Sequence, residues 1–182
     1  HHRLTARVTE RGIHTLTRKA GQTVNSTRVL LTVGDLLEDV VVVREAEAGA
    51  VLRRGTDNAA TVVRTRGGSA ANVAAAAADL VAVRFVGRVG DDRLGHGLVD
   101  ELAARGVDVR VQWGDRTGTI LVLVDADGER TMITDRGAAA HLTAIDSGVL
   151  DDVGWLHVPL YGLAVPEPAA AIIELCHTAS QR

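Results

Sequence analysis

The feature that most constrains the fold is a pair of glycines that leads directly into a run of alanines. Gly67 and Gly68 are followed by Asn72 and by an alanine-rich stretch. Glycine lets the backbone approach another group closely because it has no Cβ atom, and alanine is the best helix former. The pattern therefore predicts a tight loop that opens a helix over residues 70–80, with the Asn72 amide in the first turn.

Apolar segments alternate with amphipathic ones along the rest of the chain. Short stretches rich in apolar residues predict strands at 29–33, 83–86, 107–111 and 155–158, and helical patterns cover 94–105 and 166–176. Hydrophobic residues make up 46% of the chain but aromatic residues only 2%, so the core is expected to be aliphatic. Alternating buried strands and helices indicate an α/β fold with a parallel sheet covered on both faces.

Two segments interrupt this alternation. Residues 40–66 and 111–134 are rich in β-branched and charged residues, and Asp127-Gly128 stands between two strand-like stretches at 119–125 and 130–134. An Asp-Gly pair is typical of a two-residue hairpin turn. We expect these segments to form a second, smaller β layer. The stretch 142–149 is expected to be a short helix.

Composition excludes several classes of function. Lys19 is the only lysine and no GxxxxGK[ST] element is present, which argues against a P-loop nucleotide site and against lysine Schiff-base chemistry. The histidines lack zinc-site spacing, and Asp91-Asp92 fits an exposed acidic loop better than a metal site. No metal site is therefore predicted.

Charge and hydropathy limit the partners. Beyond residue 28 the chain is acidic, which argues against nucleic-acid binding, and no apolar run has the length of about 18–20 residues that a membrane span needs. Cys176 is the only cysteine, so disulfides within the chain are excluded and a reducing cytoplasm is the expected location. Residues 1–28 are basic and lack apolar periodicity, so we expect a disordered extension, with a targeting peptide as the alternative, before a folded domain at 29–182.

Polar residues follow the predicted strands at one edge of the sheet. Asp39, Gly67, Gly68, Asn72 and Tyr161 all come after a strand or at the mouth of the next helix. Ligands of parallel α/β sheets bind at the carboxyl ends of the strands, and a carboxylate with an amide suits a polyol. The alternatives are a strand-end cap for Asp39, an ordinary turn for the glycines and a helix-start role for Asn72.

These motifs together resemble those of the ribokinase-like (PfkB) carbohydrate kinases. The resemblance runs from about residue 29 to residue 175, like the N-terminal half of such a kinase. It rests on the segments 34–39, 67–72, 89–95, 117–119 and 135–138. Leu37 and Ser69 stand where ribokinases proper carry asparagine and lysine, so no particular sugar is indicated.

The resemblance implies a three-layer α/β/α core with a mostly parallel sheet and a small β lid, truncated at its C-terminal end. It implies sugar contacts from Asp39, Gly68 and Asn72 and from lid residues near Thr119. With Gly67 and Tyr161 from the sheet edge, the predicted substrate-binding residues are Asp39, Gly67, Gly68, Asn72, Thr119 and Tyr161. It also implies ATP and Mg²⁺ as cofactors and a possible homodimer through the lid.

The predicted function is that of an ATP-dependent sugar kinase of which this chain carries the sugar-binding and lid half. No catalytic residue is assigned, because the base and the anion hole are expected beyond Arg182. The chain alone is therefore expected to have no kinase activity. One alternative is an inactive fragment that acts as a small-ligand-binding or assembly module. The other is a nucleoside kinase of the same superfamily.

Overall fold

The computed structural model describes residues 28–44 and 52–182 of the chain. Four strands form a parallel sheet in the order β5-β4-β1-β8. Their bounds are β1 (Val29–Val33), β4 (Val83–Gly90), β5 (Asp108–Gly114) and β8 (Val153–His157). The predicted parallel sheet is confirmed, and the predicted extension at 1–28 lies outside the described residues apart from Arg28.

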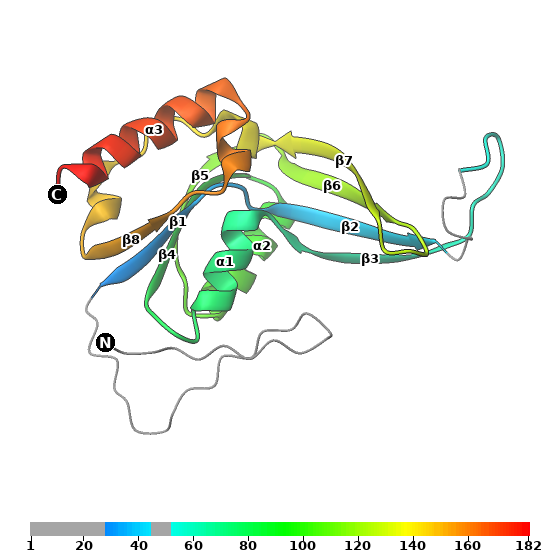
Figure 1. Cartoon of the computed structure of the whole chain (residues 1–182), viewed down its shortest axis with the longest axis horizontal. Coiled ribbons are helices and arrows are strands. Elements are labelled where there is room, and N and C mark those ends of the chain that lie inside the picture. Colours follow the sequence, from blue (N-terminus) through cyan, green and yellow to red (C-terminus); the bar gives the residue numbers. More distant parts are fainter. Residues whose placement is uncertain (1–27, 45–51) are drawn as a thin grey trace.

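Helices cover both faces of this sheet, which confirms the three-layer core (Figure 1). On one face, α1 (Ser69–Ala77) and α2 (Arg93–Ala104) bury Ala71, Ala74 and Leu102 against Phe85. On the other face, α3 (Pro166–Ser180) packs Ile172 and Leu175 against Leu31 and Val33. Among residues 28–44 and 52–182, no helix is long and apolar enough to cross a membrane.

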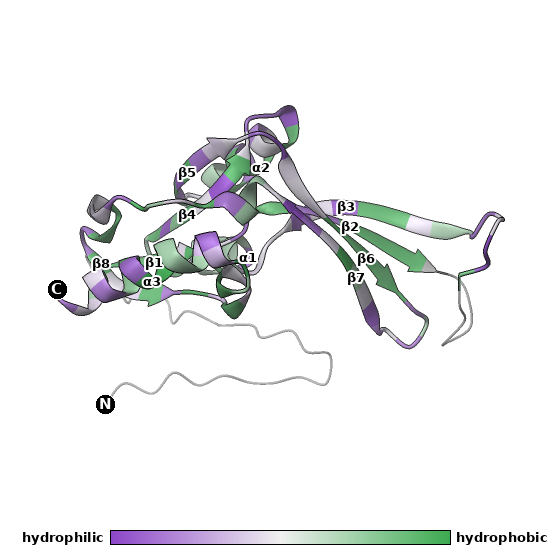
Figure 2. Ribbon diagram, turned by 90° about the horizontal axis from the view of Figure 1, so that it is seen from above, coloured by the Kyte–Doolittle hydropathy of each residue, from purple (hydrophilic) through white to green (hydrophobic). Residues whose placement is uncertain are grey.

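A second sheet, called the lid sheet below, projects from one end of the core (Figure 1). Its strand order is β3-β2-β6-β7. The strands are β2 (Leu37–Arg44), β3 (Ala60–Gly67), β6 (Thr117–Val124) and β7 (Arg130–Gly137). β2 is parallel to β6, whereas β3 and β7 run antiparallel to their neighbours. Apolar residues follow β2 and β6 for much of their length (Figure 2).

The structure differs from the sequence expectation at the lid boundaries. Residues 111–114 belong to β5 of the core, where Val111 lies opposite Gly87 and Gly114 opposite Gly90. The lid sheet therefore begins at Thr117 on this side, because β4 continues through its glycines and offers β5 a longer partner than the apolar run alone suggests.

The predicted hairpin is present, but its turn is not the two-residue kind. Only Gly128 has a positive φ, 84°, and Asp125 N–H donates to the Glu129 carbonyl at 3.0 Å. The loop therefore contains the residues from Ala126 to Gly128. Three-residue hairpin loops need only one residue with positive φ, and glycine supplies it here.

The predicted helix at 142–149 is wrong for most of its length. Short 3₁₀ turns lie on either side of an extended stretch: η1 (Ala138–His141) before it and η2 (Ser147–Leu150) at its end. Gln112 accepts the Thr143 N–H at 3.0 Å, and Asp146 accepts the Gly148 N–H at 2.7 Å. These side chains hold the backbone in a conformation that a helix would not allow.

Candidate functional site

Asp39 lies against a glycine at the base of the lid sheet. It sits on β2 opposite Thr65 of β3, two residues before Gly67. A Cβ atom on Gly67 would lie 2.1 Å from Asp39 Oδ1, so only glycine permits this approach. Oδ1 is buried and has no hydrogen-bond partner among the described residues. Burial raises the pKa of the Asp39 carboxyl above its ordinary value.

Gly68 joins the lid sheet to the core. Its φ is 97°, and a Cβ atom here would lie 2.1 Å from the carbonyl oxygen of Asp35. Both observations require glycine at this position. The turn from β3 into α1 is thereby pressed against the loop from β1 into β2. The structure thus places Asp39 against Gly67, next to Gly68 in the turn that leads into α1.

Asn72 lies in the first turn of α1. Its N–H donates to the Gly68 carbonyl at 2.9 Å, and its side chain is exposed. Asn72 Oδ1 accepts from Arg66 at 3.3 Å, and Arg66 also pairs with Glu101 of α2. The structure therefore connects Asn72 to the glycines through the backbone, while its amide oxygen is oriented by Arg66. Its amide NH₂ can act as a donor to a hydroxyl.

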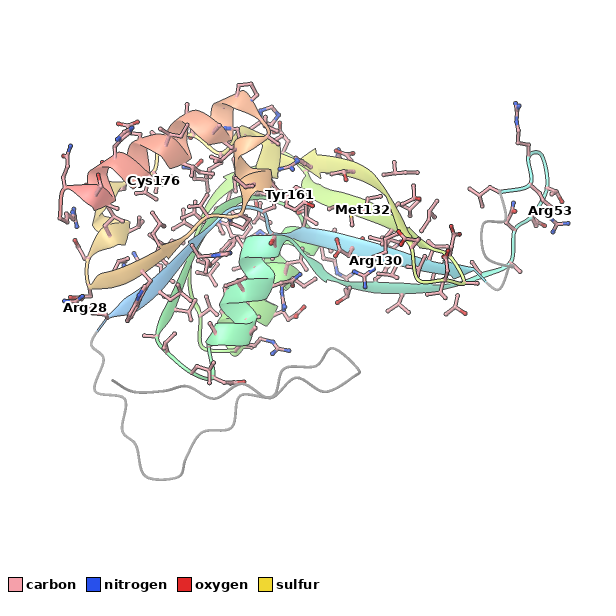
Figure 3. The ribbon with its side chains drawn as sticks, viewed as in Figure 1. Arg28, Arg53, Arg130, Met132, Tyr161 and Cys176 are labelled. Atoms are coloured by element: carbon pink, nitrogen blue, oxygen red, sulfur yellow. The ribbon has the colours of Figure 1, made fainter. Side chains whose placement is uncertain are left out.

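A largely buried ion pair, which the sequence does not indicate, lies beside these residues. Arg136, at the end of β7, donates to Asp35 Oδ2 at 2.8 Å and to the Tyr161 carbonyl at 3.0 Å. The Asp35 and Arg136 side chains are only 14% and 18% exposed. The Tyr161 side chain is exposed, and it lies near the junction of core and lid sheet (Figure 3). Arg136 therefore connects the lid sheet to two segments of the core.

Thr119 is a predicted site residue that the structure does not bring together with Asp39. On β6, Thr119 lies opposite Glu38, and Ile120 lies opposite Asp39. Side chains alternate between the two faces of a strand. Thr119 therefore shares the Glu38 face of the lid sheet, whereas Ile120 shares the Asp39 face.

The strand register of the lid sheet places further side chains on the same face as Asp39, called the Asp39 face below. Thr65 lies directly opposite Asp39 on β3, and Thr134 of β7 lies opposite Ile120. The next row outward is apolar and consists of Val63, Val41, Val122 and Met132. Figure 3 shows Met132 on the lid sheet away from the core. A row near the core that is polar except for Ile120, and an apolar row beyond it, thus cover this face.

A cavity of about 540 Å³ lies at the base of the lid sheet but is a different feature. Its walls come from Arg88, from the β5–β6 turn at Asp115 and Arg116, from residues 135–138, and from Ala140 and His141. None of the predicted substrate-binding residues lines it. The candidate site is therefore the open edge around Asp39 and the glycines.

The second residue of the acidic pair Asp91-Asp92 has a structural role. Asp92 caps α2 by accepting the Gly95 N–H, and it also accepts from Thr117 at the start of β6. Within residues 28–44 and 52–182, no group of His, Cys, Asp or Glu is placed to hold a metal ion. The described residues therefore offer no such group for the magnesium ion that the resemblance implies.

Comparison with known proteins places this chain in a family. The sequence pattern of the pfkB family carbohydrate kinases matches residues 28–158. The fructokinase of Klebsiella pneumoniae is 36% identical over 108 residues, which are 56% of this chain and 35% of that protein.

Solved structures share the fold. A fructokinase from Xylella fastidiosa, solved also with bound ATP, is 25% identical with a TM-score of 0.70, covering 85% of this chain and 49% of that one. An adenosine kinase from Sinorhizobium meliloti is 24% identical with a TM-score of 0.70, covering 86% and 54%. The chain thus spans about half the length of these structures and about a third of the Klebsiella enzyme. With the family pattern matched from the first strand to the end of the fourth core strand, the chain belongs to the pfkB family of carbohydrate kinases.

Proposed function

We propose that this chain forms the sugar-binding and lid part of an ATP-dependent carbohydrate kinase. The observation that carries the proposal is the Asp39 carboxylate, which is held against Gly67 with a buried oxygen that has no partner among the described residues. Buried polar atoms are nearly always hydrogen-bonded in folded proteins. A hydroxyl donor from a bound polyol satisfies this oxygen.

The surrounding groups complete a site for a compound rich in hydroxyls. An ionised carboxylate only accepts hydrogen bonds, so Asp39 can bind two neighbouring hydroxyls at once. Asn72 supplies an amide donor, and the turn at Gly67 and Gly68 lets Asp39 and the Asp35 carbonyl approach the backbone closely. Of the predicted substrate residues, we propose that Asp39, Gly67, Gly68 and Asn72 form this site, with Tyr161 at its border. Asn72 belongs to α1 rather than to the lid sheet, and its amide oxygen accepts from Arg66, which is on the other face of that sheet from Asp39. Thr119 lies on the other face of the lid sheet.

Phosphoryl transfer is proposed to depend on groups outside residues 1–182. Such a reaction needs a base near the acceptor hydroxyl and donors around the developing charge on the phosphates. ATP and Mg²⁺ enter the proposal through the family and through the fructokinase solved with bound ATP. A reducing cytoplasm, where ATP is available, is the proposed location.

The test is a binding panel on the full chain, read by isothermal titration calorimetry. Fructose, ribose and adenosine are titrated separately, and product formation with ATP and Mg²⁺ is measured in parallel. The proposal expects saturable binding of a sugar without turnover above background. Tight binding of adenosine alone supports the nucleoside-kinase alternative instead, and absence of binding by every compound contradicts the proposal.

The lid sheet is also proposed to mediate homodimerisation. Val63 and Met132 on the Asp39 face and Val62 and Ile133 on the other face are exposed. Exposed apolar sheet faces favour association with a second copy. Sedimentation velocity should show a dimer that Met132→Glu weakens, whereas Ile173→Glu, at an exposed position of α3, leaves it intact. A monomeric wild-type chain contradicts the proposal.

A further inference from the structure

Two arginine side chains border the candidate site, and each is paired with a carboxylate. Arg66 lies opposite Glu38 and is therefore on the other face from Asp39, where it pairs with Glu101. Arg136 is two residues beyond Thr134, which shares the Asp39 face through Ile120. Strand alternation therefore puts Arg136 on the Asp39 face.

Arg136 is connected to the glycine turn through a single residue, Asp35. Its Nη1 atom donates to Asp35 Oδ2 at 2.8 Å, and the backbone carbonyl of the same Asp35 is the group that packs against Gly68. Both side chains of the pair are largely buried. Burial raises the pKa of the Asp35 carboxyl, and the Arg136 charge opposes that rise without reversing it.

The charge of Arg136 decides which substrates the site can accept. A guanidinium matches carboxylate and phosphate groups in a bidentate geometry and binds them strongly. An Arg136 freed from Asp35 would therefore attract sugar acids and sugar phosphates. With Asp35 paired to it, an anionic substrate meets the carboxylates of Asp35 and Asp39 without a compensating positive charge.

We propose that Asp35 makes this site selective for uncharged polyols by neutralising Arg136. The inference rests on the proposed sugar-binding function and adds the substrate class to it. It also assigns a role in substrate specificity to Asp35 and Arg136, which are not among the predicted substrate-binding residues. Asp35 acts through Arg136 and is a positioning residue in this account.

A purely structural role for the pair makes a different prediction. If Asp35 and Arg136 only anchored the lid sheet, their loss would change stability and would weaken all sugars equally. Charge neutralisation instead changes the ratio of affinities for uncharged and acidic sugars. That ratio is the quantity to measure.

The experiment compares fructose and ribose with gluconate and ribonate by calorimetry on the full chain. The wild type should bind the uncharged probes at least about tenfold more tightly than the acids, the scale of one hydrogen bond to a charged group. Asp35→Asn should reduce this preference by about tenfold, through tighter binding of the acids. Adding Arg136→Met to Asp35→Asn should abolish the gain.

Asp135→Asn is the matched control. Asp135 pairs with Arg116 at the same junction, but both side chains are exposed and Asp135 shares the Thr119 face. Its removal should leave the affinity ratio unchanged. Thermal unfolding of each variant verifies folding, and Asp35→Ser replaces Asp35→Asn if the latter is unfolded.

The outcomes separate the two proposals. An unchanged ratio in Asp35→Asn and Asp35→Ser, with wild-type sugar binding intact, overturns the role of Asp35 but leaves the function standing. A tenfold lower preference for uncharged sugars in the Asp135→Asn control, equal to that in Asp35→Asn, also overturns the role of Asp35. A wild type that binds neither class of compound overturns the proposed function, and the inference with it.

Discussion

The carboxylate of Asp92 accepts both the backbone N–H and the hydroxyl of Thr117, each at 2.7 Å. Asp92 is the N-cap of α2, and Thr117 is the first residue of β6. A single side chain therefore fixes the start of a core helix to the start of the lid sheet. The orientation of the lid sheet over the Asp39 site depends in part on this contact.

Asp92→Ala should destabilise the chain. Loss of an N-cap costs about 1 kcal/mol, and leaving the largely buried Thr117 N–H without its acceptor adds about 1–3 kcal/mol. Urea unfolding followed by circular dichroism measures the difference. Asp91→Ala is the control, because the Asp91 side chain is exposed and its ion-pair partner, His96, is exposed as well, while the backbone N–H that donates to the Gly114 carbonyl is kept. Equal stability of the two variants contradicts the role of Asp92.

The same carboxylate predicts a pH dependence. Burial alone would raise the pKa of Asp92, but the hydrogen bonds from Thr117 and Gly95 outweigh burial and hold the pKa below its ordinary value. A carboxyl whose pKa is lower in the folded state stabilises the fold fully at pH values above its ordinary pKa of about 3.9. This stabilisation is lost as the pH falls through the folded-state pKa.

The free energy of unfolding should therefore fall on acidification below about pH 5, and it should fall less steeply in Asp92→Asn. Denaturant titrations across this range measure both slopes. Asp108 and Asp135, whose pKa values are also lowered by hydrogen bonds to arginines, contribute equally to both proteins. Identical slopes would show that Asp92 does not carry the effect.

Gly68→Ala should be strongly destabilising and should weaken sugar binding. The φ of 97° is costly for alanine, by roughly 1–3 kcal/mol, and its Cβ atom would overlap the Asp35 carbonyl. Gly97→Ala is the matched control within α2, where a Cβ atom meets nothing within 4 Å. That change should stabilise the helix by up to about 1 kcal/mol. A tolerated alanine at position 68 would contradict the close packing of the turn.

The two faces of the lid sheet predict opposite results for two threonines. Thr65 lies opposite Asp39 and Thr119 lies opposite Glu38, so their hydroxyls are on different faces. Thr65→Val should lower sugar affinity by a few-fold, the scale of one neutral hydrogen bond of about 1 kcal/mol. Thr119→Val should leave affinity unchanged, as measured by calorimetry. A larger loss from Thr119→Val would show that the substrate contacts the other face.

The core could be predicted from the sequence because its signals are local. Short stretches rich in apolar residues mark the core strands, and the glycine pair before the alanines marks the start of α1. An N-cap role for Asp92 was also accessible, since an aspartate before the first helical residue is a common helix start. Its second contact, with Thr117, depends on how the lid sheet is placed.

The remainder of the site depends on contacts between distant residues. Asp35 and Arg136 are 101 residues apart, and no local pattern indicates that they pair. The face occupied by Thr119 follows from the register of β2 with β6, and a shift of one residue would reverse it. Such relationships require the assembled sheet.

The most direct measurement is the sugar affinity of Asp39→Asn, which keeps the size of the side chain but removes its charge. The account predicts a loss of at least about tenfold at neutral pH, because hydrogen bonds to a charged group are worth about 1.5–3 kcal/mol. Asp100→Asn, at an exposed position of α2, should bind as the wild type does. Because the pKa of Asp39 is raised, wild-type affinity should also fall on acidification before the pH reaches the ordinary aspartate value. An Asp39→Asn protein that is folded and binds sugar with wild-type affinity would contradict the assignment of this site.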